Sequence, residues 1–288
     1  MTLRFAKMTG AGNDFIVFDN RQGQVPEPDP RWIAKLCSRR FSVGADGLML
    51  LGPAAGPGLD FSMRYFNADG SEAAMCGNGG RCLARFAVLV NVGEEGRDLR
   101  FSSASGVYTA RVEGSRVRLS LPAPARQQTG LRLVLSTGER EADSIDTGVP
   151  HAVFFTDAVE REDVKGLGRE VRLHPAFAPQ GTNVNFCQVL GPNRLSVRTY
   201  ERGVEDETLA CGTGVAAASL LAAARGLVRP PVAVLTRSGL ELEMNFTAGP
   251  AGFSEITQRG EARLVYWAEA ADEATAFTPP DRPAPACA

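Results

Sequence analysis

The sequence predicts an α+β protein of two pseudo-symmetric domains, each a mixed or antiparallel sheet wrapped around a buried central helix. Three observations predict this fold class. The chain has 288 residues, which is enough for two domains at about 150 residues per domain. It contains an internal repeat with one Cys-Gly motif in each copy. Apolar runs behind these cysteines, and alternating segments around them, predict a helix among strands in each copy.

The repeat relates the two halves of the chain. Residues 75–80 read MCGNGG and residues 210–214 read ACGTG, and the two cysteines lie 135 positions apart. Three matched pairs at nearly one offset, in the same order, indicate two copies of one fold. The copies are expected to join near residues 121–124, which read LPAP. The other two pairs, at offsets of 136 and 134 positions, are residues 12–18 with 148–154 and residues 64–67 with 198–201.

Alternation of apolar and polar side chains predicts the strands. Residues 61–65 (FSMRY) alternate as a half-buried strand does. Turn-forming residues between further apolar segments predict three hairpins. The strands are expected to form an antiparallel or mixed sheet in each half. The hairpins span residues 107–121, 183–200 and 232–246, with turns at residues 113–115, 191–193 and 237–239.

The apolar runs behind Cys76 and Cys211 predict one helix in each half. Residues 215–224 (VAAASLLAAA) contain no charged residue, and the run behind Cys76 carries only Arg81 and Arg85. A helix that is apolar on all sides is buried, whereas a surface helix has an apolar stripe. Both helices are therefore expected at the centre of their sheets.

These elements give the expected domain boundaries. The N-terminal domain is predicted to span residues 1–122 and to carry Cys76, with the segment of about residues 264–275 completing it. The C-terminal domain is predicted to span residues 123–263 and to carry Cys211. Residues 276–288 are rich in proline and alanine, which predicts a disordered tail.

Composition excludes several classes of function. The net charge of −2 and the pI of about 5.9, with dispersed Lys and Arg, argue against nucleic acid as a partner. No run of 18 uncharged apolar residues occurs, so no membrane span is expected. The first residues lack the apolar core of a signal peptide, and the chain is expected to be cytoplasmic. The two histidines, His151 and His174, lie in no metal-ligand spacing, so no metal site is expected.

The six cysteines are expected to be reduced thiols. Three of them have apolar neighbours and are predicted to pack as small buried hydrophobes, namely Cys37, Cys82 and Cys187. Cys287 lies in the tail and is expected to be exposed. Cys76 and Cys211 differ from these four because each directly precedes a predicted helix.

The two predicted helix starts indicate a site for an anion. The first N–H groups of a helix have no partner within the helix and carry partial positive charge. They therefore hold anions, and they are expected to lower the pKa of a thiol placed there toward neutrality. Glycines at both starts let a ligand approach the backbone closely. If the copies face each other, a carboxylate lies in the cleft between the domains, with a sulfur on either side of its α-carbon.

That arrangement suits proton exchange at the α-carbon of an amino acid. One thiolate removes the hydrogen from one face, and the opposite thiol returns a hydrogen to the other face. The charge that develops on the carboxylate meets the two helix N-termini. The product is the epimer, and the expected partner is a small-molecule substrate.

Longer motifs give the sequence a specific resemblance. They are residues 7–15 (KMTGAGNDF), 43–47 (VGADG), 66–72 (FNADGSE), 75–79 (MCGNG), 181–186 (GTNVNF), 200–204 (YERGV) and 207–214 (ETLACGTG). With these motifs the chain resembles the diaminopimelate epimerase family from Phe5 to about Trp267. The related proline racemases typically have Cys-Gly-His at the first cysteine, where this chain has Asn78.

The resemblance implies a fold, a reaction and an assembly. The fold is that of two pseudo-symmetric domains with the active site in the cleft between them. The reaction is the epimerisation of LL-2,6-diaminopimelate to meso-2,6-diaminopimelate, a step that serves lysine and peptidoglycan-precursor biosynthesis. It uses a pair of cysteines and needs no cofactor and no metal ion. The assembly is a homodimer.

The resemblance also implies a role for each site residue. Cys76 is the proton donor and Cys211 the proton acceptor. The residues that flank them and fix the reacting stereocentre are His151 and Glu201. The residues that hold the carboxylate at the reacting centre are Gly77, Asn78, Gly212 and Thr213. The residues that bind the distal amino-acid end of the substrate are Asn13, Asn67, Asn183, Glu201 and Arg202.

The chain departs from the family pattern at three places. Many members have Asn where this chain has Val149, so one carboxamide contact is in question. Some members have Gln at the position of Gly47, so a second contact is absent or made by backbone. The loop from Glu201 to Cys211 is one residue longer than the commoner form.

Individual residues of this pattern have a second interpretation. Asn13 and Asn67 stand beside glycines or turn residues and are also typical of turns. His151 follows a proline and could be a loop histidine bonded to backbone. Glu201 and Arg202 could form an ordinary surface ion pair of little energetic weight. The joint pattern, rather than any single residue, favours a functional site.

Two other classes of function use the same residues. A binding protein would keep the fold and the pocket without turnover, and it would not exchange the α-hydrogen of its ligand with solvent. A thiol–disulfide oxidoreductase could use Cys76 and Cys211. Such enzymes usually carry a C-x-x-C motif, which these two cysteines do not form.

Overall fold

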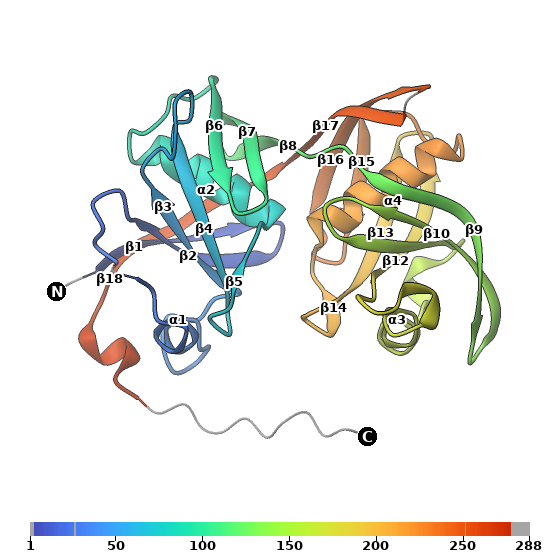
Figure 1. Cartoon of the computed structure of the whole chain (residues 1–288), viewed down its shortest axis with the longest axis horizontal. Coiled ribbons are helices and arrows are strands. Elements are labelled where there is room, and N and C mark those ends of the chain that lie inside the picture. Colours follow the sequence, from blue (N-terminus) through green and yellow to red (C-terminus); the bar gives the residue numbers. More distant parts are fainter. Residues whose placement is uncertain (1–2, 26, 251, 278–288) are drawn as a thin grey trace.

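Two lobes lie side by side in the computed structural model, which describes residues 3–25, 27–250 and 252–277 (Figure 1). Each lobe has one long helix surrounded by strands of a mixed sheet. The predicted α+β class is therefore confirmed. The two strands that run between the lobes, β8 (Arg116–Ser120) and β17 (Gly252–Glu261), are visible at the top of Figure 1.

The sheet of the N-terminal lobe combines strands from both ends of the chain. Besides β8, its strands are β1 (Leu3–Gly10), β2 (Asn13–Asp19), β3 (Gly47–Gly52), β4 (Phe61–Asn67), β5 (Glu72–Ala73), β6 (Asp98–Ser103), β7 (Gly106–Glu113) and β18 (Arg263–Ala270). Its helices are α1 (Pro30–Leu36), α2 (Gly77–Leu89) and the short 3₁₀ segment η3 (Asp272–Thr275).

The C-terminal lobe has the corresponding elements. Besides β17, its strands are β9 (Ala125–Leu135), β10 (Gly138–Asp146), β11 (Pro150–Phe155), β12 (Asn183–Gly191), β13 (Arg194–Glu201), β14 (Asp206–Thr208), β15 (Val232–Thr236) and β16 (Glu241–Gly249). Its helices are α3 (Val164–Arg172), α4 (Gly212–Ala224) and the 3₁₀ segments η1 (Val159–Arg161) and η2 (Pro175–Phe177).

Strand pairing repeats from one lobe to the other. In the N-terminal lobe, β1 pairs antiparallel with β2, β2 parallel with β3, β3 antiparallel with β4 and β4 parallel with β6, before the antiparallel run β6–β7–β8. The C-terminal lobe follows the same order through β10, β11, β12, β13, β15, β16 and β17. The sequence repeat is thus a repeat of topology, with α2 matched by α4.

The lobes are joined by backbone as well as by side chains. β17 pairs with β16 over its first part and with β8 over its second part. β18 then returns to the N-terminal lobe and pairs antiparallel with β1. Ala11, in the β1–β2 turn, packs in the core of the other lobe. The position of each cysteine-bearing helix is therefore fixed relative to the other.

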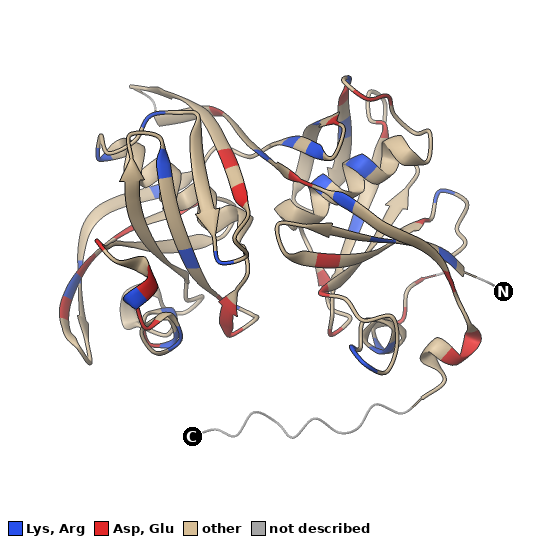
Figure 2. Cartoon of the chain, turned by 180° about the vertical axis from the view of Figure 1, so that it is seen from behind, with Lys and Arg blue, Asp and Glu red and all other residues tan. Residues whose placement is uncertain are grey.

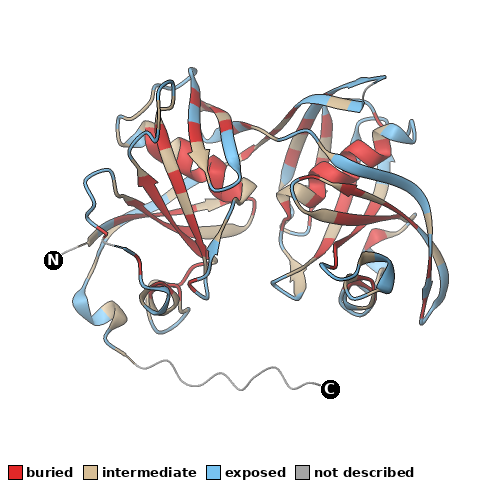
Figure 3. Ribbon diagram, in the orientation of Figure 1, coloured by how far each residue is buried: buried red, intermediate tan, exposed pale blue. Residues whose placement is uncertain are grey.

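The two central helices are buried as predicted. Both α2 and α4 lie in the interior of their lobes (Figure 3). α4 is apolar on all sides and packs among Val197, Val234 and Met244. α2 packs among strands β1, β2, β7 and β8, in a core that contains Phe86 and Phe101.

Each lobe also has a short outer helix that the sequence analysis did not predict. α1 begins after the cap residue Asp29 and spans only one to two turns. α3 contains Gly166 and Gly168, which lower helix propensity. A Cβ at Gly168 would lie 2.5 Å from the Cβ of Tyr200, so this glycine lets α3 pack directly on β13. The expectation of one helix in each half was therefore wrong.

The predicted strands are present. Residues 61–65 lie in β4, and the three predicted hairpins correspond to β7–β8, β12–β13 and β15–β16. The three cysteines expected to pack as small hydrophobes are buried in the cores, as predicted, and are Cys37, Cys82 and Cys187. Of the tail predicted over residues 276–288, residues 278–288, Cys287 among them, lie outside the described residues. Phe277 stacks on Phe41.

Charged residues of both signs are interspersed over the two lobes (Figure 2). In the part of the chain that the structure describes, no helix has the length and apolar character needed to cross a membrane.

Candidate active site

Cys76 is the N-cap residue of α2. Its backbone is extended, with φ −134° and ψ 120°, and its Sγ accepts a hydrogen bond from the Gly79 N–H at 3.4 Å. A cap of this kind satisfies one of the N–H groups that the first helical turn leaves without a partner. A Cβ at Gly79 would lie 3.0 Å from the Sδ of Met49. The glycine therefore allows the start of the helix to pack closely against β3.

Cys211 occupies the same position on α4. Its backbone is extended, with φ −104° and ψ 110°, and its Sγ accepts from the Gly214 N–H at 3.4 Å. The Sγ also lies 3.4 Å from the Oγ1 of Thr213, in a hydrogen bond. Repetition of the cap in both lobes gives two thiols with the same relation to a buried helix.

The two helix starts are bonded to each other. Asn78 Nδ2 donates to the carbonyl oxygen of Ala210 at 3.2 Å, and Gln258 Nε2 donates to the carbonyl oxygen of Gly212 at 2.8 Å. A Cβ would lie 3.5 Å from Gln258 Oε1 at Gly77 and 3.1 Å from it at Gly212. One side chain of β17 therefore lies against the first residue of both helices. The structure brings the predicted carboxylate-binding segments together.

Strand ends bring the remaining candidates to one edge of each sheet. In the N-terminal lobe, β3 begins at Gly47, which is in register with Asn67 at the end of β4. In the C-terminal lobe, β12 begins at Asn183, which is in register with His151 near the start of β11. Glu201 ends β13 as Asn67 ends β4. The pseudo-symmetry thus pairs an amide in one lobe with a carboxylate in the other.

Asn13 and Asn78 contact each other through their amides. Asn78 Nδ2 donates to Asn13 Oδ1 at 2.7 Å, and Asn13 Nδ2 donates to Asp46 Oδ2 at 3.0 Å. Because Asn78 Nδ2 also bonds to Ala210, both of its N–H groups are engaged. Asn78 can therefore offer a ligand its backbone N–H but not its amide N–H groups.

Asn183 and Arg202 are joined in the other lobe. The Arg202 backbone N–H donates to Asn183 Oδ1 at 2.8 Å, and Asn183 Nδ2 donates to the carbonyl oxygen of Pro150 at 3.3 Å. Asn67 is bonded within its own turn, where its Nδ2 donates to Ser71 Oγ at 3.0 Å. The structure shows no bond between Asn67 and the other predicted site residues that it describes.

Burial raises the pKa of both candidate thiols. For Cys76, burial outweighs the stabilising N–H of Gly79 and the charge of Arg81. For Cys211, burial is again the main cause, and the charge of the Glu201 carboxylate raises its pKa further. The expectation that the helix starts lower these pKa values toward neutrality was therefore wrong. Desolvation of the charged form therefore dominates over the helix N-terminus at both thiols.

Glu201 lies close enough to act on both thiols. The Glu201 carboxylate helps to raise the pKa of the Cys211 thiol, and Glu201 Oε1 accepts from Thr208 Oγ1 at 3.0 Å. Its charge also raises the pKa of Cys76. Burial raises the pKa of Glu201 itself. A carboxylate with a raised pKa beside a thiol can accept the proton of that thiol.

His151 is buried and neutral. Asn185 Nδ2 lies 3.1 Å from His151 Nδ1, and the same Nδ2 donates to the carbonyl oxygen of Ala152, while Asn185 Oδ1 accepts from Thr199 Oγ1. Asn185 therefore presents an N–H to Nδ1, which places the imidazole proton on Nε2. No hydrogen-bond partner of Nε2 is found among the described residues. Burial, helped by the charge of Arg202, lowers the pKa of His151 to about 3.

The free energy of unfolding is expected to fall as the pH is lowered from about 6.5 toward 3. Over this range the unfolded chain binds a proton at His151 that the folded chain excludes. The contribution of neutral His151 to the free energy of unfolding is complete above pH 6.5. Below that pH it decreases by up to about 1.4 kcal/mol per pH unit. Urea unfolding of the wild type and of the His151→Leu variant at several pH values measures this contribution. The stability difference between them should shrink on acidification. An equal change with His174→Leu would contradict the assignment to His151.

The structure explains the departure from the family pattern at Gly47 and shows the surroundings of the other two. A Cβ at Gly47 would lie 2.5 Å from the carbonyl oxygen of Phe66 and 2.7 Å from Cε2 of Tyr65, so the Tyr65 ring fills the space of a side chain there. Val149 is half-buried, and its carbonyl oxygen accepts from the Thr147 N–H at 3.2 Å. The loop after Glu201 folds back as β14, which pairs antiparallel with β13.

Sequence reasoning missed several residues that shape the site. Tyr65 is buried, and the charges of Cys76 and Glu201 act on it. Gln258 and Asn185 are fully buried polar residues on strands. The polar residue types alone gave no signal, since alternation along a strand usually places such side chains in solvent. Arg81 did give a signal, because it is one of two charged residues in a helix that is otherwise largely apolar.

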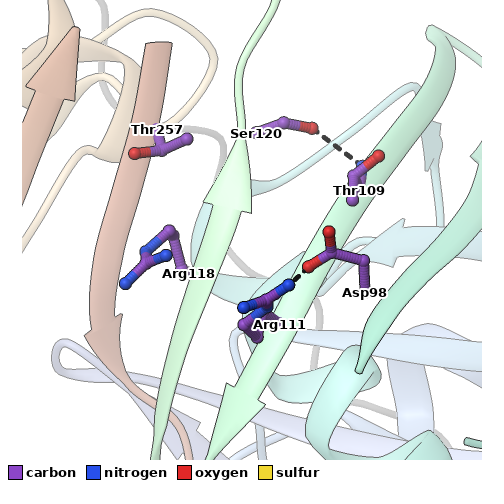
Figure 4. Close-up of a pocket in the computed structure, with 6 residues that line it drawn as sticks. All are labelled: Asp98, Thr109, Arg111, Arg118, Ser120 and Thr257. Atoms are coloured by element: carbon purple, nitrogen blue, oxygen red, sulfur yellow. Dashed lines mark hydrogen bonds and ion pairs between the residues drawn. The ribbon is translucent and has the colours of Figure 1, made fainter. Parts of the chain in front are cut away.

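A surface pocket lies away from both cysteines. Figure 4 shows it on strands β6, β7, β8 and β17, lined by Asp98, Thr109, Arg111, Arg118, Ser120 and Thr257. Arg111 Nε donates to Asp98 Oδ1 at 2.7 Å within it. None of the predicted site residues lines this pocket. Within the described ranges, no three His, Cys, Asp or Glu side chains gather as a group that could hold a metal ion.

Known proteins resemble this chain over most of its length. The family model described as "Diaminopimelate epimerase" matches residues 5–120 and 144–265. The curated diaminopimelate epimerase of Chlorobaculum tepidum is 42% identical over 261 residues, covering 90% of this chain and 98% of that protein. That of Aquifex aeolicus is 42% identical over 255 residues, covering 85% and 90%.

Solved structures share the fold at low sequence identity. A probable proline racemase from Agrobacterium radiobacter superposes with a TM-score of 0.69 at 19% identity, covering 96% of each chain. A Bacillus anthracis protein of the PhzF phenazine-biosynthesis family gives a TM-score of 0.73 at 15% identity, covering 94% of this chain and 99% of that one. These likenesses show the two-lobed fold alone.

Proposed function

The chain belongs to the diaminopimelate epimerase family, and from that premise we propose that Cys76 and Cys211 exchange protons on opposite faces of one substrate carbon. The chain is an isomerase that interconverts LL- and meso-2,6-diaminopimelate, a step of lysine biosynthesis. The observation that carries the proposed mechanism is the pair of N-cap thiols on α2 and α4, whose helix starts are bonded through Asn78 and Gln258.

The reacting carboxylate is held by backbone N–H groups in this mechanism. The first residues of α2 and α4 (Gly77, Asn78, Gly212 and Thr213) present helix N-termini to one place. Two helix N-termini favour an anion, and they favour it most when charge develops on the carboxylate as the α-hydrogen leaves. This supports the roles proposed for these four residues.

Glu201 gives the two thiols different roles in the forward direction. The Glu201 carboxylate acts on the pKa of Cys211 more directly than on that of Cys76, and in this proposal it takes the Cys211 thiol proton. Cys211 then acts as the proton acceptor, while Cys76 remains a thiol and acts as the proton donor. In the reverse direction the roles exchange. His151, neutral and with its proton on Nε2, serves as a hydrogen-bond donor that orients the reacting centre.

The distal end of the substrate is bound by donors. Asn13 Nδ2 and Asn183 Nδ2 each make one of the described hydrogen bonds, to Asp46 and to Pro150, which leaves each amide one N–H for a ligand. Arg202 adds a guanidinium that, among the described residues, is engaged at one nitrogen, with the carbonyl oxygen of Gln180. Donors of this kind recognise a carboxylate. We therefore place the distal carboxylate of diaminopimelate among these residues and Asn67.

A homodimer is part of the proposal. β18 pairs with β1 on one side, and its exposed side chains include Val265, Tyr266 and Trp267. Contiguous exposed apolar side chains on a soluble protein mark interaction surfaces, which supports a second copy at this strand. Sedimentation equilibrium of the full chain tests it. We also place the enzyme in the cytoplasm, which fits the free thiols at all five described cysteines.

The proposed mechanism is tested by the fate of deuterium. LL-Diaminopimelate is incubated with the enzyme in deuterated water, and both isomers are analysed by NMR at early times. Two thiols on opposite faces should place solvent deuterium in the meso product while the remaining LL substrate keeps its hydrogen. Equal early labelling of both isomers would indicate a single base and would overturn the mechanism. A protein that only binds the substrate would label neither.

Gly214→Ala is expected to reduce both activity and stability. A Cβ at Gly214 would overlap Asn185 Oδ1 and lie 3.1 Å from Thr199 Oγ1, so the bonds that hold His151 would shift. Overpacking of this kind costs about 1–3 kcal/mol of unfolding free energy. Urea unfolding and epimerisation assays measure the two effects. Gly191→Ala is the matched control, since a Cβ there meets nothing within 4 Å. Equal behaviour of the two variants would refute the role of this contact.

A further inference from the structure

Arg81 is a fully buried arginine in the second turn of α2. Its guanidinium packs on the backbone of β17, where a Cβ at Gly260 would lie 3.0 Å from the Arg81 Nε and 3.1 Å from its Cζ. The equivalent residue of α4 in the sequence repeat is Ala216. The arginine therefore belongs to one lobe only, and the symmetry of the repeat does not explain it.

Hydrogen bonds connect Arg81 to both cysteine-bearing segments. Its Nη2 donates to Asn78 Oδ1 at 2.5 Å, and its Nη1 donates to Gln258 Oε1. The amide nitrogens of these two side chains donate onward, to the carbonyl oxygens of Ala210 and Gly212. Arg81 is thus bonded through one amide on each side to the backbone that precedes and follows Cys211. It also stands on the helix that Cys76 caps.

The charge of Arg81 lacks a counter-ion. Among residues 3–25, 27–250 and 252–277, no carboxylate forms an ion pair with Arg81, and its Nε has no hydrogen-bond partner. Burial lowers the pKa of Arg81 to about 10, so the guanidinium stays charged at neutral pH. A buried cation without an anion is destabilising. The anions that the reaction brings to this place are a thiolate and the substrate carboxylate.

We propose that Arg81 is a positioning residue for the epimerisation, which holds the two helix starts at the spacing of one carboxylate and stabilises the Cys76 thiolate with its buried charge. The spacing of the helix starts is held by the two Nη groups of the guanidinium (its fork), because they bond to Asn78 and Gln258 at the same time. The thiolate is stabilised by the positive charge of Arg81. This charge acts on Cys76 more than on Cys211, because α4 has no equivalent arginine. This inference rests on the proposed two-thiol mechanism.

The first experiment separates the fork from the charge by steady-state kinetics. Arg81→Met removes both and is expected to lower kcat/KM for LL-diaminopimelate by roughly 100-fold, as removal of one donor from an anion-stabilising site does. Arg81→Lys keeps the charge and is expected to recover part of this loss. Arg85→Met is the matched control on the same helix, since the one hydrogen bond of Arg85 to the described part of the chain goes to the carbonyl oxygen of Ala262. Equal losses in the Arg81→Met and Arg85→Met variants would overturn the proposal.

The second experiment measures a property that a purely structural role would not change. Site-resolved alkylation of Cys76 by iodoacetamide is followed against pH in a Cys211→Ser background. Adding Arg81→Met should move the alkylation profile to higher pH, whereas Arg81→Lys and Arg85→Met should leave it in place. An unchanged profile in Arg81→Met would overturn the electrostatic part of the proposal. If Arg81→Met does not fold, the Arg81→Lys comparison still decides, because loss of the fork alone must lower kcat without moving the profile.

The two proposals fail in different ways. If the wild type shows no solvent labelling of the product, the two-thiol mechanism fails whatever Arg81 does. If the wild type labels the product as expected, and Arg81→Met behaves as Arg85→Met in both assays, only the inference about Arg81 fails.

Discussion

Cys76→Ala and Cys211→Ala are each expected to abolish epimerisation of LL-diaminopimelate while the protein stays folded. Each face of the reacting carbon needs its own proton carrier, and each thiol caps one of the two joined helix starts. Loss of a general acid or base lowers rates by about 10²–10⁴-fold, and here no neighbouring group takes over the lost face. Serine at either position should leave weak activity, because a hydroxyl is a far poorer base than a thiol. A coupled assay for the meso isomer measures these rates.

Other cysteines provide the matched controls for this prediction. Cys82 and Cys187 are fully buried in the two cores, so Cys82→Ala and Cys187→Ala should cost roughly 1 kcal/mol of stability and leave kcat unchanged. Full activity of either the Cys76→Ala or the Cys211→Ala variant would contradict the two-thiol mechanism. Inactivity of the Cys82→Ala variant would show that the assay reports folding rather than chemistry.

L-Lysine is expected to react at least about 10⁴-fold more slowly than diaminopimelate, the discrimination reached when a site is built to hydrogen-bond a missing group. Lysine lacks the distal carboxylate, so Asn13, Asn183 and Arg202 would keep N–H groups without acceptors. Each unpaired buried polar group costs roughly 1–3 kcal/mol. Binding energy at this end also positions the reacting carbon. Chiral chromatography of both amino acids after incubation with the enzyme measures the ratio.

Variants at the distal end sharpen this prediction. Arg202→Met should lower the rate with diaminopimelate far more than the rate with lysine, and Asn67→Ala should act in the same direction. Arg229→Met, at an exposed arginine of the same lobe, is the control for loss of charge. Comparable turnover of lysine and diaminopimelate by the wild type would contradict the assignment of these residues to the distal end of the substrate. The thiol chemistry would then stand with another substrate.

The repeated cysteine motifs and the apolar helices could be predicted from the sequence because they depend on local composition. Residues 215–224 have no charge and therefore form a helix buried on all sides, and glycine at the residue after each cysteine indicated a close backbone approach. α1 and α3 were missed because short helices with glycine or proline owe their stability to packing. Gly168 is an example, since the absence of a side chain there leaves the space that Tyr200 occupies.

The direction of the thiol pKa shifts could not be predicted from the sequence. The helix N-terminus is a local feature, and its effect on Cys76 is present in the bond from Gly79. Burial is a property of the whole fold, and it depends on the other lobe and on residues such as Gln258, which is 177 positions from Arg81. The same distance in sequence explains why Arg81, although conspicuous in an apolar helix, could not be assigned partners.

The return of the chain to its first sheet has a consequence for how the protein is made. The ribosome synthesises β1 long before β18, yet the two strands are hydrogen-bonded neighbours, and β8 is likewise synthesised long before its partner β17. A nascent chain ending near residue 121 would have two strand edges without partners, and such edges invite pairing with other chains. The N-terminal lobe therefore completes its sheet only after β18 has been synthesised, so truncations between β8 and β18 should leave the N-terminal lobe incompletely folded.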